Sequence, residues 1–376
     1  MSSGTAKSPA KKVLRVLLSL IGALVLAFLA LIIFLSLTEY RPAAREAVEI
    51  TVSSASADST DSADATEASA PGTPSFTMVS WNIGYGALGD NADFFMDGGK
   101  SVNTASRERV MENLSGITDF LKEQSPDFIL LQETDINSSR SHKINEEQHL
   151  IDALPGYSTS FAYNFNVSFL PYPVPPIGHV ESGLVTMSSR PVSSAERIQL
   201  PIPFSWPIRM ANLKRCLLIN RIPLEGSGDA GKELVLVNLH LEAYDDGEGK
   251  TAQTAMLREI LGAEASAGNY VIAGGDFNQI FDSVESPFPV YEGKWQPGVM
   301  EAGVFSDSFS CLMDDKAASC RSLDQPLSGA DLSTFQFYII DGFLVSKNIE
   351  VEEFGTADLG FVHSDHNPVL LRFSLR

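Results

Sequence analysis

The stretch YVIAGGDFN, residues 270–278, indicates the fold class of this chain. Its first residues are apolar one after another rather than at alternate positions, which is typical of a β-strand covered on both faces. The run ends in Asp276, and Asn278 follows, so polar side chains stand where the strand gives way to a loop. Binding and catalytic residues often gather at such positions. We therefore expect a buried sheet with a chemical site at the end of this strand.

Similar apolar runs recur along the chain from residue 76 onwards. They are FTMVSWNI (76–83), DFILLQE (127–133), GLVTMS (183–188), CLLINRI (216–222), ELVLVNLH (233–240), FQFYIIDGFLVS (335–346) and PVLLRF (368–373). Two segments, 105–124 and 252–266, have apolar residues at helical spacing instead. Many strands and few helices predict an α/β protein in which two packed sheets are flanked by helices within one domain.

The N-terminal region has the composition of a membrane segment. Residues 16–37 are almost wholly apolar, which is long enough for a helix to cross a bilayer. Basic residues cluster before them, so we predict a cytoplasmic tail at 1–15 and the rest of the chain outside the cytoplasm. A cleaved signal peptide is the alternative, but its apolar core spans only about 7–15 residues. We therefore favour one transmembrane helix at 16–37 that anchors the protein in the cell membrane.

Residues 53–74 are rich in Ser, Ala, Thr, Asp and Pro and contain no aromatic residue. Such a segment cannot bury enough apolar surface to fold. We predict a disordered linker at 38–75 and a catalytic domain at 76–376. The formal net charge of -20 argues against a protein that holds nucleic acid through clustered Lys and Arg. It does not exclude a phosphoesterase, because bound divalent cations can invert the local field.

The three cysteines do not decide whether the protein contains a disulfide. Cys311 and Cys320 are close in sequence, and a location outside the cytoplasm permits either a disulfide or two free thiols. Cys216 lies within an apolar run and is expected in the core. The sequence has neither a Cys-x-x-Cys nor a His-Glu-x-x-His pattern, so we do not expect a structural or protease zinc site.

Oxygen-bearing side chains end several of the apolar runs. Asn82 ends the first run, Glu133 ends the second, and Asp276 and Asn278 follow the run at 270–275. Carboxylate and amide oxygens select hard cations such as Mg²⁺ or Mn²⁺ rather than zinc or copper. The pattern indicates a metal-dependent hydrolytic site, although Asn82 alone is also compatible with a turn before Gly84.

Two histidines are candidates for acid–base chemistry. His240 ends a strand-like run, and His366 follows Asp365 in the loop before the last run. An unperturbed imidazole titrates near neutrality. Asp341 lies inside the apolar run FYIIDGFLV, where a carboxylate is costly unless it is paired. It is either a satisfied core carboxylate or the group that orients a catalytic imidazole. Arg221 is equally compatible with a phosphate contact and a salt bridge at a strand edge.

Taken in order, SWNIGYG, LQETD, SGLVTMSSRP, VNLHLEAY, GGDFN, IIDGFLVS and SDHNPV resemble the motifs of the endonuclease/exonuclease/phosphatase (DNase I-like) superfamily. The resemblance covers nearly all of 76–376. It implies a four-layer α/β sandwich, with two packed mixed sheets between layers of helices. It also implies a Mg²⁺- or Mn²⁺-dependent hydrolase of phosphoric esters.

The resemblance assigns roles to individual residues. It implies that Asn82, Glu133 and Asp365 belong to the metal site. It also implies that Asp276 and Asn278 hold the attacking water and the scissile phosphate.

The histidines take the remaining roles that the resemblance implies. His366, oriented by Asp341, would be the base or a phosphate clamp. His240 would stabilise developing charge or protonate the leaving oxygen.

The substrate depends on three stretches that mix proline with aromatic residues and carry little charge: 161–180, 201–210 and 286–298. They are either loops packed on the domain or an apolar rim for a hydrophobic leaving group. With the membrane anchor, they favour a phosphodiesterase for a lipid or small organophosphate. HLEAY (240–244) also resembles neutral sphingomyelinases. An extracellular nuclease is the alternative, and a non-catalytic binding module is a third possibility.

Overall fold

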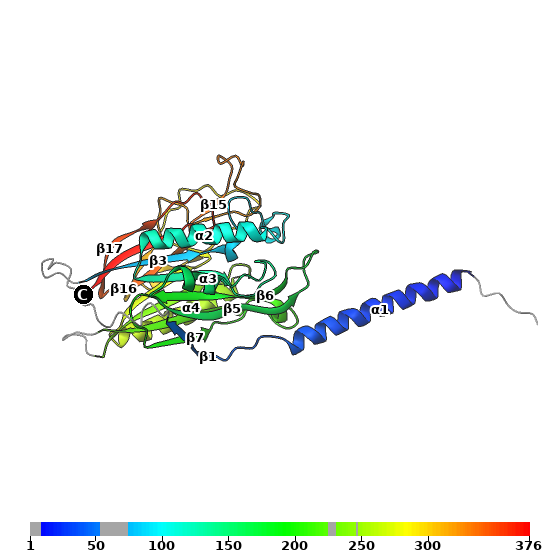
Figure 1. Cartoon of the computed structure of the whole chain (residues 1–376), viewed down its shortest axis with the longest axis horizontal. Helices are drawn as coiled ribbons and strands as arrows, with labels where there is room; N and C mark the ends of the chain where they lie inside the picture. The colour runs from blue at the N-terminus through cyan, green and yellow to red at the C-terminus, as the bar shows by residue number, and fades with distance from the viewer. Residues whose placement is uncertain (1–8, 53–73, 225–230, 246) are drawn as a thin grey trace, which may run out of the picture.

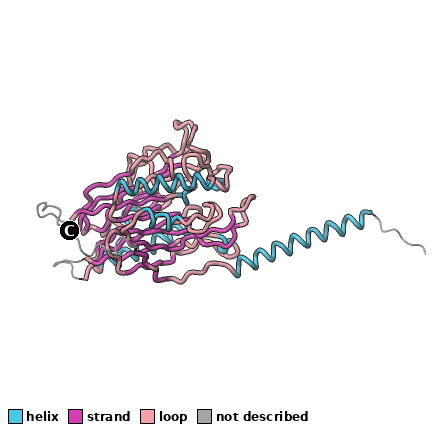
Figure 2. Tube along the Cα trace, viewed as in Figure 1, coloured by secondary structure: helices cyan, strands magenta, loops and turns pink. Residues whose placement is uncertain are grey.

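Two seven-stranded sheets packed face to face make up most of the described chain (Figures 1 and 2). The computed structural model describes residues 9–52, 74–224, 231–245 and 247–376. The first sheet has the order β17 (Ile349–Thr356), β18 (Val369–Leu375), β3 (Ser75–Asn82), β4 (Phe128–Asp135), β6 (Gly178–Ser188), β5 (Ser158–Leu170) and β2 (Ile50–Val52). The second has the order β1 (Arg45–Val48), β7 (Ser194–Gln199), β8 (Cys216–Pro223), β9 (Glu233–His240), β10 (Tyr270–Asp276), β16 (Asp341–Ser346) and β13 (Phe309–Leu312).

Both sheets are mixed. The pairs β3·β4 and β9·β10 are parallel, while the other neighbours in each sheet are antiparallel. Two small ribbons accompany them: β11 (Gln279–Phe281) with β12 (Gly298–Met300), and β14 (Cys320–Arg321) with β15 (Phe337–Tyr338). Short 3₁₀ turns lie at Gly84–Gly86, Phe95–Asp97, Ile208–Ala211 (η5) and Ala302–Val304.

The apolar side chains form three stacked layers. One lies between the sheets and includes Phe128, Ile272 and Phe373. Helices α2 (Arg107–Gln124) and α3 (Glu146–Ala153) cover the outer face of the first sheet, and α4 (Glu248–Ser266) covers that of the second. Every residue of β10 is buried, as expected for a strand covered on both faces. The predicted four-layer α/β sandwich is confirmed.

Helix α2 shows how the local sequence sets an element. The side chain of Ser106 accepts a hydrogen bond from the amide of Arg109, which caps the first turn. Val110, Leu114 and Leu121 lie on its buried face. Ser125 has a left-handed backbone, and Pro126 follows, so the helix ends there. The bounds differ from the predicted 105–124 by two residues at the start.

Two predicted segments differ in the structure. The loop predicted at 161–180 is mostly strand: β5 runs to Leu170, β6 begins at Gly178, and residues 171–177 form the tip of this hairpin. The linker predicted at 38–75 contains β1, which pairs with β7, and β2, which pairs with β5. Its low-complexity part, 53–73, lies outside the described residues, as do residues 1–8 of the predicted tail.

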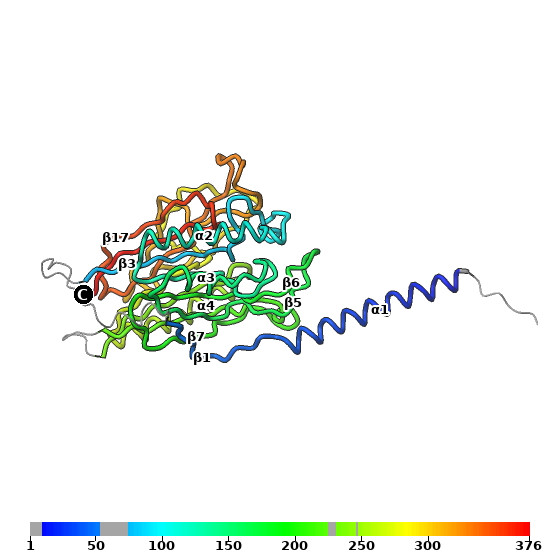
Figure 3. The backbone as a smooth tube through the Cα atoms, in the orientation of Figure 1, coloured from blue at the N-terminus to red at the C-terminus, as the bar shows by residue number. Residues whose placement is uncertain are grey.

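Helix α1 (Pro9–Leu37) extends away from the domain (Figures 1 and 3). It is long and apolar enough to cross a membrane, and it begins seven residues before the predicted start at residue 16. Its C-terminal end contacts η5, the short turn at Ile208–Ala211.

Candidate active site

The strand register of the second sheet brings three of the predicted residues side by side. In the parallel pair β9·β10, Asp276 lies opposite His240, and in the antiparallel pair β10·β16 it lies opposite Asp341. All three side chains are buried. Gly275, just before Asp276, has φ of 147°, and a Cβ there would lie 1.9 Å from the carbonyl oxygen of Leu239. Only glycine allows the two parallel strands to approach in this way.

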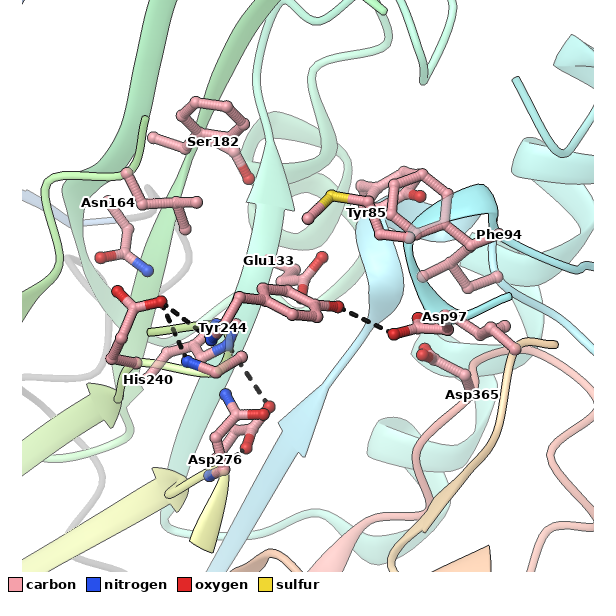
Figure 4. A pocket seen from close by; sticks show the side chains of 18 of the residues that line it. Tyr85, Phe94, Asp97, Glu133, Asn164, Ser182, His240, Tyr244, Asp276 and Asp365 are labelled. Carbon is pink, nitrogen blue, oxygen red and sulfur yellow. Dashed lines mark hydrogen bonds and ion pairs between the residues drawn. The ribbon is translucent and has the colours of Figure 1, made fainter. Parts of the chain in front are cut away.

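The first sheet supplies Asn82 and Glu133. Asn82 is the last residue of β3. Glu133 lies where the register of β4 against β6 shifts, between Leu131 and Thr134, and its φ is 55°. A bulge redirects the side chain of the strand that carries it. This irregularity places the Glu133 carboxylate in the cavity beside Asp276 (Figure 4).

The amide of Asn82 links the two sheets. Its Nδ2 donates hydrogen bonds to Glu133 Oε1 at 3.3 Å and to Asp276 Oδ2 at 3.0 Å. Its Oδ1 accepts a hydrogen bond from the backbone amide of Gly84 at 3.1 Å. The predicted ligand oxygen of Asn82 therefore faces the turn, and its nitrogen faces the carboxylates. Asn82 thus contacts the turn, as one interpretation expects, and also contacts two of the predicted site carboxylates.

Asp276 is the centre of the polar cluster. Its Oδ1 accepts a hydrogen bond from the amide of Asn278 at 2.8 Å, and Oδ2 lies 3.4 Å from His240 Nε2 and 3.8 Å from His366 Nε2. Burial and the nearby charge of Asp341 raise the pKa of Asp276 to about 7. Asn278 has φ of 50° and donates from Nδ2 to the carbonyl of Leu241.

The two imidazoles have opposite charge preferences. His366 Nδ1 lies 2.8 Å from Asp341 Oδ2. Burial lowers the pKa of His366, but the charge and hydrogen bond of Asp341, together with the other acidic groups around the ring, outweigh burial and hold the pKa well above its ordinary value. Burial and the positive charge of Arg215 hold the pKa of His240 well below its ordinary value. At neutral pH, His366 is therefore an imidazolium and His240 a neutral imidazole.

Backbone contacts fix the loop that carries His366. The indole Nε1 of Trp81 donates to the carbonyl of His366 at 2.8 Å. The hydroxyl of Ser364 donates to the carbonyl of Asn82 at 2.8 Å, which ties this loop to the end of β3. The hydroxyl oxygen of Ser319 accepts from the amide of Asp341 at 3.1 Å. Both members of the His366–Asp341 pair are thus held by main-chain bonds.

Glu133 and Asp365 suit a hard divalent cation. Asp365 is 5% exposed, and its pKa is raised to about 6 by burial and by the negative charge of Glu133. A divalent cation between these carboxylates would offset their repulsion, and carboxylate oxygens are ligands that Mg²⁺ and Mn²⁺ accept. The donor set therefore fits the predicted cofactor. Ligand atoms of Asp365, His366 and Cys320 also lie within 4.8 Å of one another.

These side chains line a cavity of about 360 Å³ (Figure 4). Its deep part is polar, whereas apolar residues line much of the rest: Leu88, Phe94, Phe95, Met96, Phe165, Leu170, Tyr172, Ile177, Phe204 and Leu213. The hydroxyl of Tyr244 donates to Asp97 Oδ1 at 3.0 Å across the cavity (Figure 4). The site can therefore hold a phosphate at its base and an apolar group above it.

The family model for the endonuclease/exonuclease/phosphatase family matches residues 79–366, which contain all eight predicted site residues. The chain belongs to this family. Members of the family hydrolyse phosphoric esters. A comparison with curated protein sequences gave no match.

Two solved structures of endonuclease/exonuclease/phosphatase proteins share the fold. The endonuclease/exonuclease/phosphatase from Beutenbergia cavernae DSM 12333 is 18% identical, with a TM-score of 0.54 over 80% of this chain and 72% of that chain. The family protein from Leptotrichia buccalis C-1013-b is 14% identical, with a TM-score of 0.51 over 80% of this chain and 100% of that one. The human Nocturnin catalytic domain, solved with a bound sulfate anion, is 18% identical, with a TM-score of 0.48 over 81% and 96%.

Three arginines that the sequence did not predict as site residues line the cavity. Arg140 donates to both carboxylate oxygens of Asp135, at 2.9 and 3.1 Å, and its guanidinium lies 3.6 Å from the ring centroid of Tyr85. Arg215 pairs with Glu242 in the same cavity.

Arg321 is the third of these arginines, and it donates to the carbonyls of Leu88, Gly89 and Ala92. None of the three stands in a motif or an apolar run, so the sequence gives no local signal for them.

The structure decides between the alternatives that the sequence left open for Arg221 and for the cysteines. Arg221 forms salt bridges with Glu233 and Glu264 and does not line the cavity, so it is a strand-edge ion pair. Cys311 and Cys320 are free thiols rather than a disulfide, and Cys216 is buried in the core as expected.

Proposed function

We propose that this chain is a divalent-metal-dependent phosphodiesterase that acts outside the cytoplasm on a lipid or a small organophosphate. The observation that carries the proposal is one cavity with two chemically different parts. Acidic and imidazole side chains from both sheets meet at its base, and apolar side chains line much of the rest. A substrate with a phosphate ester and a hydrophobic group matches both parts.

The metal side of the proposed reaction rests on Glu133 and Asp365. These two carboxylates would hold Mg²⁺ or Mn²⁺, and a bound cation would supply positive charge that stabilises the reacting phosphate ester. Asn82 holds Glu133 and Asp276 in place through its Nδ2, so it acts here as a positioning residue rather than as an oxygen ligand.

Asp276 is the group best placed to accept a proton from the attacking water. A pKa of about 7 lets a carboxylate take up a proton near neutral pH while it is still ionised in part of the molecules. The amide of Asn278 fixes Asp276 Oδ1, which leaves Oδ2 facing the two imidazoles. The water would therefore lie between Asp276 and the phosphorus atom.

The imidazoles provide charge and a hydrogen bond. His366, an imidazolium held by Asp341, stabilises negative charge on the phosphoryl oxygens as they develop it. His240 is neutral, and its Nδ1 has no hydrogen-bond partner among the described residues. It therefore offers a hydrogen bond, rather than a charge, to the phosphate or to the leaving oxygen.

The surroundings of the site support a lipid or small organophosphate over nucleic acid. The arginines that reach the cavity are occupied by Asp135, Glu242 and backbone carbonyls. The chain carries a net charge of -20, which repels a polyanion at long range. Helix α1 would anchor the protein in the cell membrane with the domain on the outer side, because basic residues cluster at the N-terminal end of the helix.

The test is hydrolysis by the full chain in phosphatidylcholine nanodiscs, with Mg²⁺ or Mn²⁺ and with EDTA as the control. The panel is bis-p-nitrophenyl phosphate, sphingomyelin, phosphatidylinositol phosphates and plasmid DNA. We expect metal-dependent cleavage of the soluble diester and of one lipid, and its loss in Asp276→Asn. Asp307→Asn, which changes an exposed carboxylate, is the matched control. Cleavage of plasmid DNA alone would favour the nuclease, and binding without turnover would favour the binding module.

A further inference from the structure

Two uncharged segments project from the end of the domain at which α1 leaves. The tip of the β5–β6 hairpin has the sequence PYPVPPIG (171–178), and the loop before β8 contains FSWPI (204–208). Their side chains Tyr172, Val174, Trp206 and Ile208 are 68%, 92%, 54% and 63% exposed. We call these four residues the apolar rim. Grouped exposed apolar side chains of this kind mark an interaction surface.

The apolar rim is fixed to the end of the membrane helix. The indole Nε1 of Trp206 donates to Ser36 Oγ at 3.2 Å, and Ser36 Oγ donates to the sulfur of Met210 at 2.9 Å. Just beyond the helix, Glu39 forms ion pairs with Arg209 at 2.9 Å and Lys214 at 3.6 Å. In Figure 1 the hairpin tip and the C-terminal end of α1 lie at the same end of the domain. These contacts give α1 and the rim a fixed relative position.

The apolar rim also borders the mouth of the active-site cavity. Tyr172 lines the cavity, and so do Leu170 and Ile177 on either side of the hairpin tip. The ring of Phe95, which also lines the cavity, packs edge-to-face on Tyr172 with centroids 5.7 Å apart. An apolar path therefore runs from the exposed rim to the polar base of the cavity.

We infer that the apolar rim inserts into the outer leaflet of the membrane that α1 crosses, so that the cavity opens at the bilayer surface. The inference rests on the proposed membrane anchoring and deepens the proposed function. Trp and Tyr favour the membrane interface, and no charge on either segment opposes insertion. Because Ser36, near the end of α1, touches the rim, the bilayer that receives α1 lies next to it. The substrate is then an amphiphilic phosphate ester of the same leaflet, with its apolar chain along the rim.

A fluorescence experiment tests the position of the rim without any activity. The full chain carries Trp206→Phe together with Val174→Trp and is reconstituted in nanodiscs of brominated or plain phosphatidylcholine. The control carries Trp206→Phe with Leu332→Trp, because Leu332 is 60% exposed in the loop between β14 and β15. We expect brominated lipid to quench the reporter at position 174 by at least half and the one at position 332 by less than a tenth. Equal quenching at both positions, or none at 174, would overturn the inference.

A kinetic experiment tests whether the apolar rim is needed for turnover of a substrate that lies in the bilayer. Val174 and Ile208 do not line the cavity in the described part of the chain. In Val174→Asp/Ile208→Asp we expect turnover of a bilayer-embedded substrate to fall at least tenfold. Turnover of bis-p-nitrophenyl phosphate should stay within twofold, and Leu332→Asp should leave both substrates unaffected. An equal loss on both substrates would show that the rim supports the fold rather than the membrane contact.

The two proposals fail in different ways. If the wild-type chain hydrolyses nothing in the panel, the proposed function fails, and the quenching still decides the position of the rim. If it hydrolyses lipid while the reporter at position 174 is not quenched, the inference about the rim fails alone. Concentration-dependent dimers that Val174→Asp/Ile208→Asp dissociates would mean that the rim binds a second copy of the chain, which also overturns the inference.

Discussion

Replacing Asp341 by Asn tests whether the His366–Asp341 pair acts as one unit. The substitution keeps the size of the side chain and removes a charge 2.8 Å from His366 Nδ1. At an effective dielectric constant of about 20, two unit charges about 4 Å apart interact by ~4 kcal/mol. Burial still lowers the pKa of His366 when the charge of Asp341 is gone, so we expect this pKa to be much lower in the variant than in the wild type.

The expected loss follows from the change in charge. His366 is an imidazolium at pH 7 in the wild type and neutral in Asp341→Asn, so kcat/KM at pH 7 should fall by about 10²- to 10⁴-fold. Protonation of Asp276 lowers the activity of both proteins at acid pH, so the quantity to follow is the ratio of variant to wild-type kcat/KM. This ratio should rise as the pH falls from 7 to 5, because the imidazole of the variant regains its proton there. The assay is kcat/KM for bis-p-nitrophenyl phosphate from pH 5 to 9 at saturating Mg²⁺, with thermal unfolding as the check on folding.

A double-mutant cycle provides the refutation. If the pair acts as a unit, Asp341→Asn/His366→Ala should be no slower than His366→Ala alone. Additive losses would show that Asp341 acts independently of the imidazole. A kcat/KM for Asp341→Asn above one third of the wild-type value, with an unchanged pH profile, would refute the assigned charge state of His366.

Three further predictions concern stability in detergent micelles. Mg²⁺ or Mn²⁺ at about 100 times its dissociation constant should stabilise the EDTA-treated chain by ~2.7 kcal/mol, and Glu133→Gln should lose most of that gain in a thermal melt; equal gains would exclude Glu133 as a ligand. Gly84→Ala should cost about 1–3 kcal/mol in urea unfolding, because φ is +52° and the new Cβ would lie 2.8 Å from an oxygen of Asp365; Gly262→Ala, with nothing within 4 Å inside α4, should instead stabilise by about 0.5–1 kcal/mol. Burial raises the pKa of Asp97 from 3.8 to about 7, so its protonated form stabilises the fold below pH 3.8 and this contribution is lost as the pH rises to 7. Asp97→Asn should therefore gain on the order of 1–2 kcal/mol more at pH 8 than at pH 5 in the absence of metal, after allowance for partial exposure; a pH-independent effect would contradict the raised pKa.

The sequence predicted most of the strands that are buried on both faces and missed several of those that are not. The run at 270–276 is wholly buried in the structure, and a continuous apolar stretch has few alternatives to such a strand. β5 mixes polar with aromatic residues, and its residues 158–170 alternate irregularly between buried and half-buried. Such a pattern does not distinguish a strand with one buried face from a loop, so the sequence predicts a loop at 161–180. The short helix α3 has too few turns for a helical period to be recognised.

Site residues could be predicted individually because most of them lie at or near a strand end. Their mutual geometry could not, because it depends on which strands pair: the contact of Asp276 with both His240 and Asp341 needs β10 between β9 and β16. The direction of the Asn82 amide depends on the turn at Gly84. Arg140 reaches the cavity through its contacts with Asp135, which no sequence pattern announces.

The strands β1 and β2 change what a soluble form of this protein must contain. Eight residues, 45–52, form the edge strand β1, which covers β7 of one sheet, and the edge strand β2, which covers β5 of the other. A protease that cut between α1 and residue 45 would release a domain in which β7 and β5 are still paired. A cut at residue 75 would remove β1 and β2, and β7 and β5 would become open edges, each able to recruit a strand from another molecule. Two cleavage sites only a few tens of residues apart would therefore have different results. One releases an intact domain from the membrane, and the other releases a domain that is prone to aggregate.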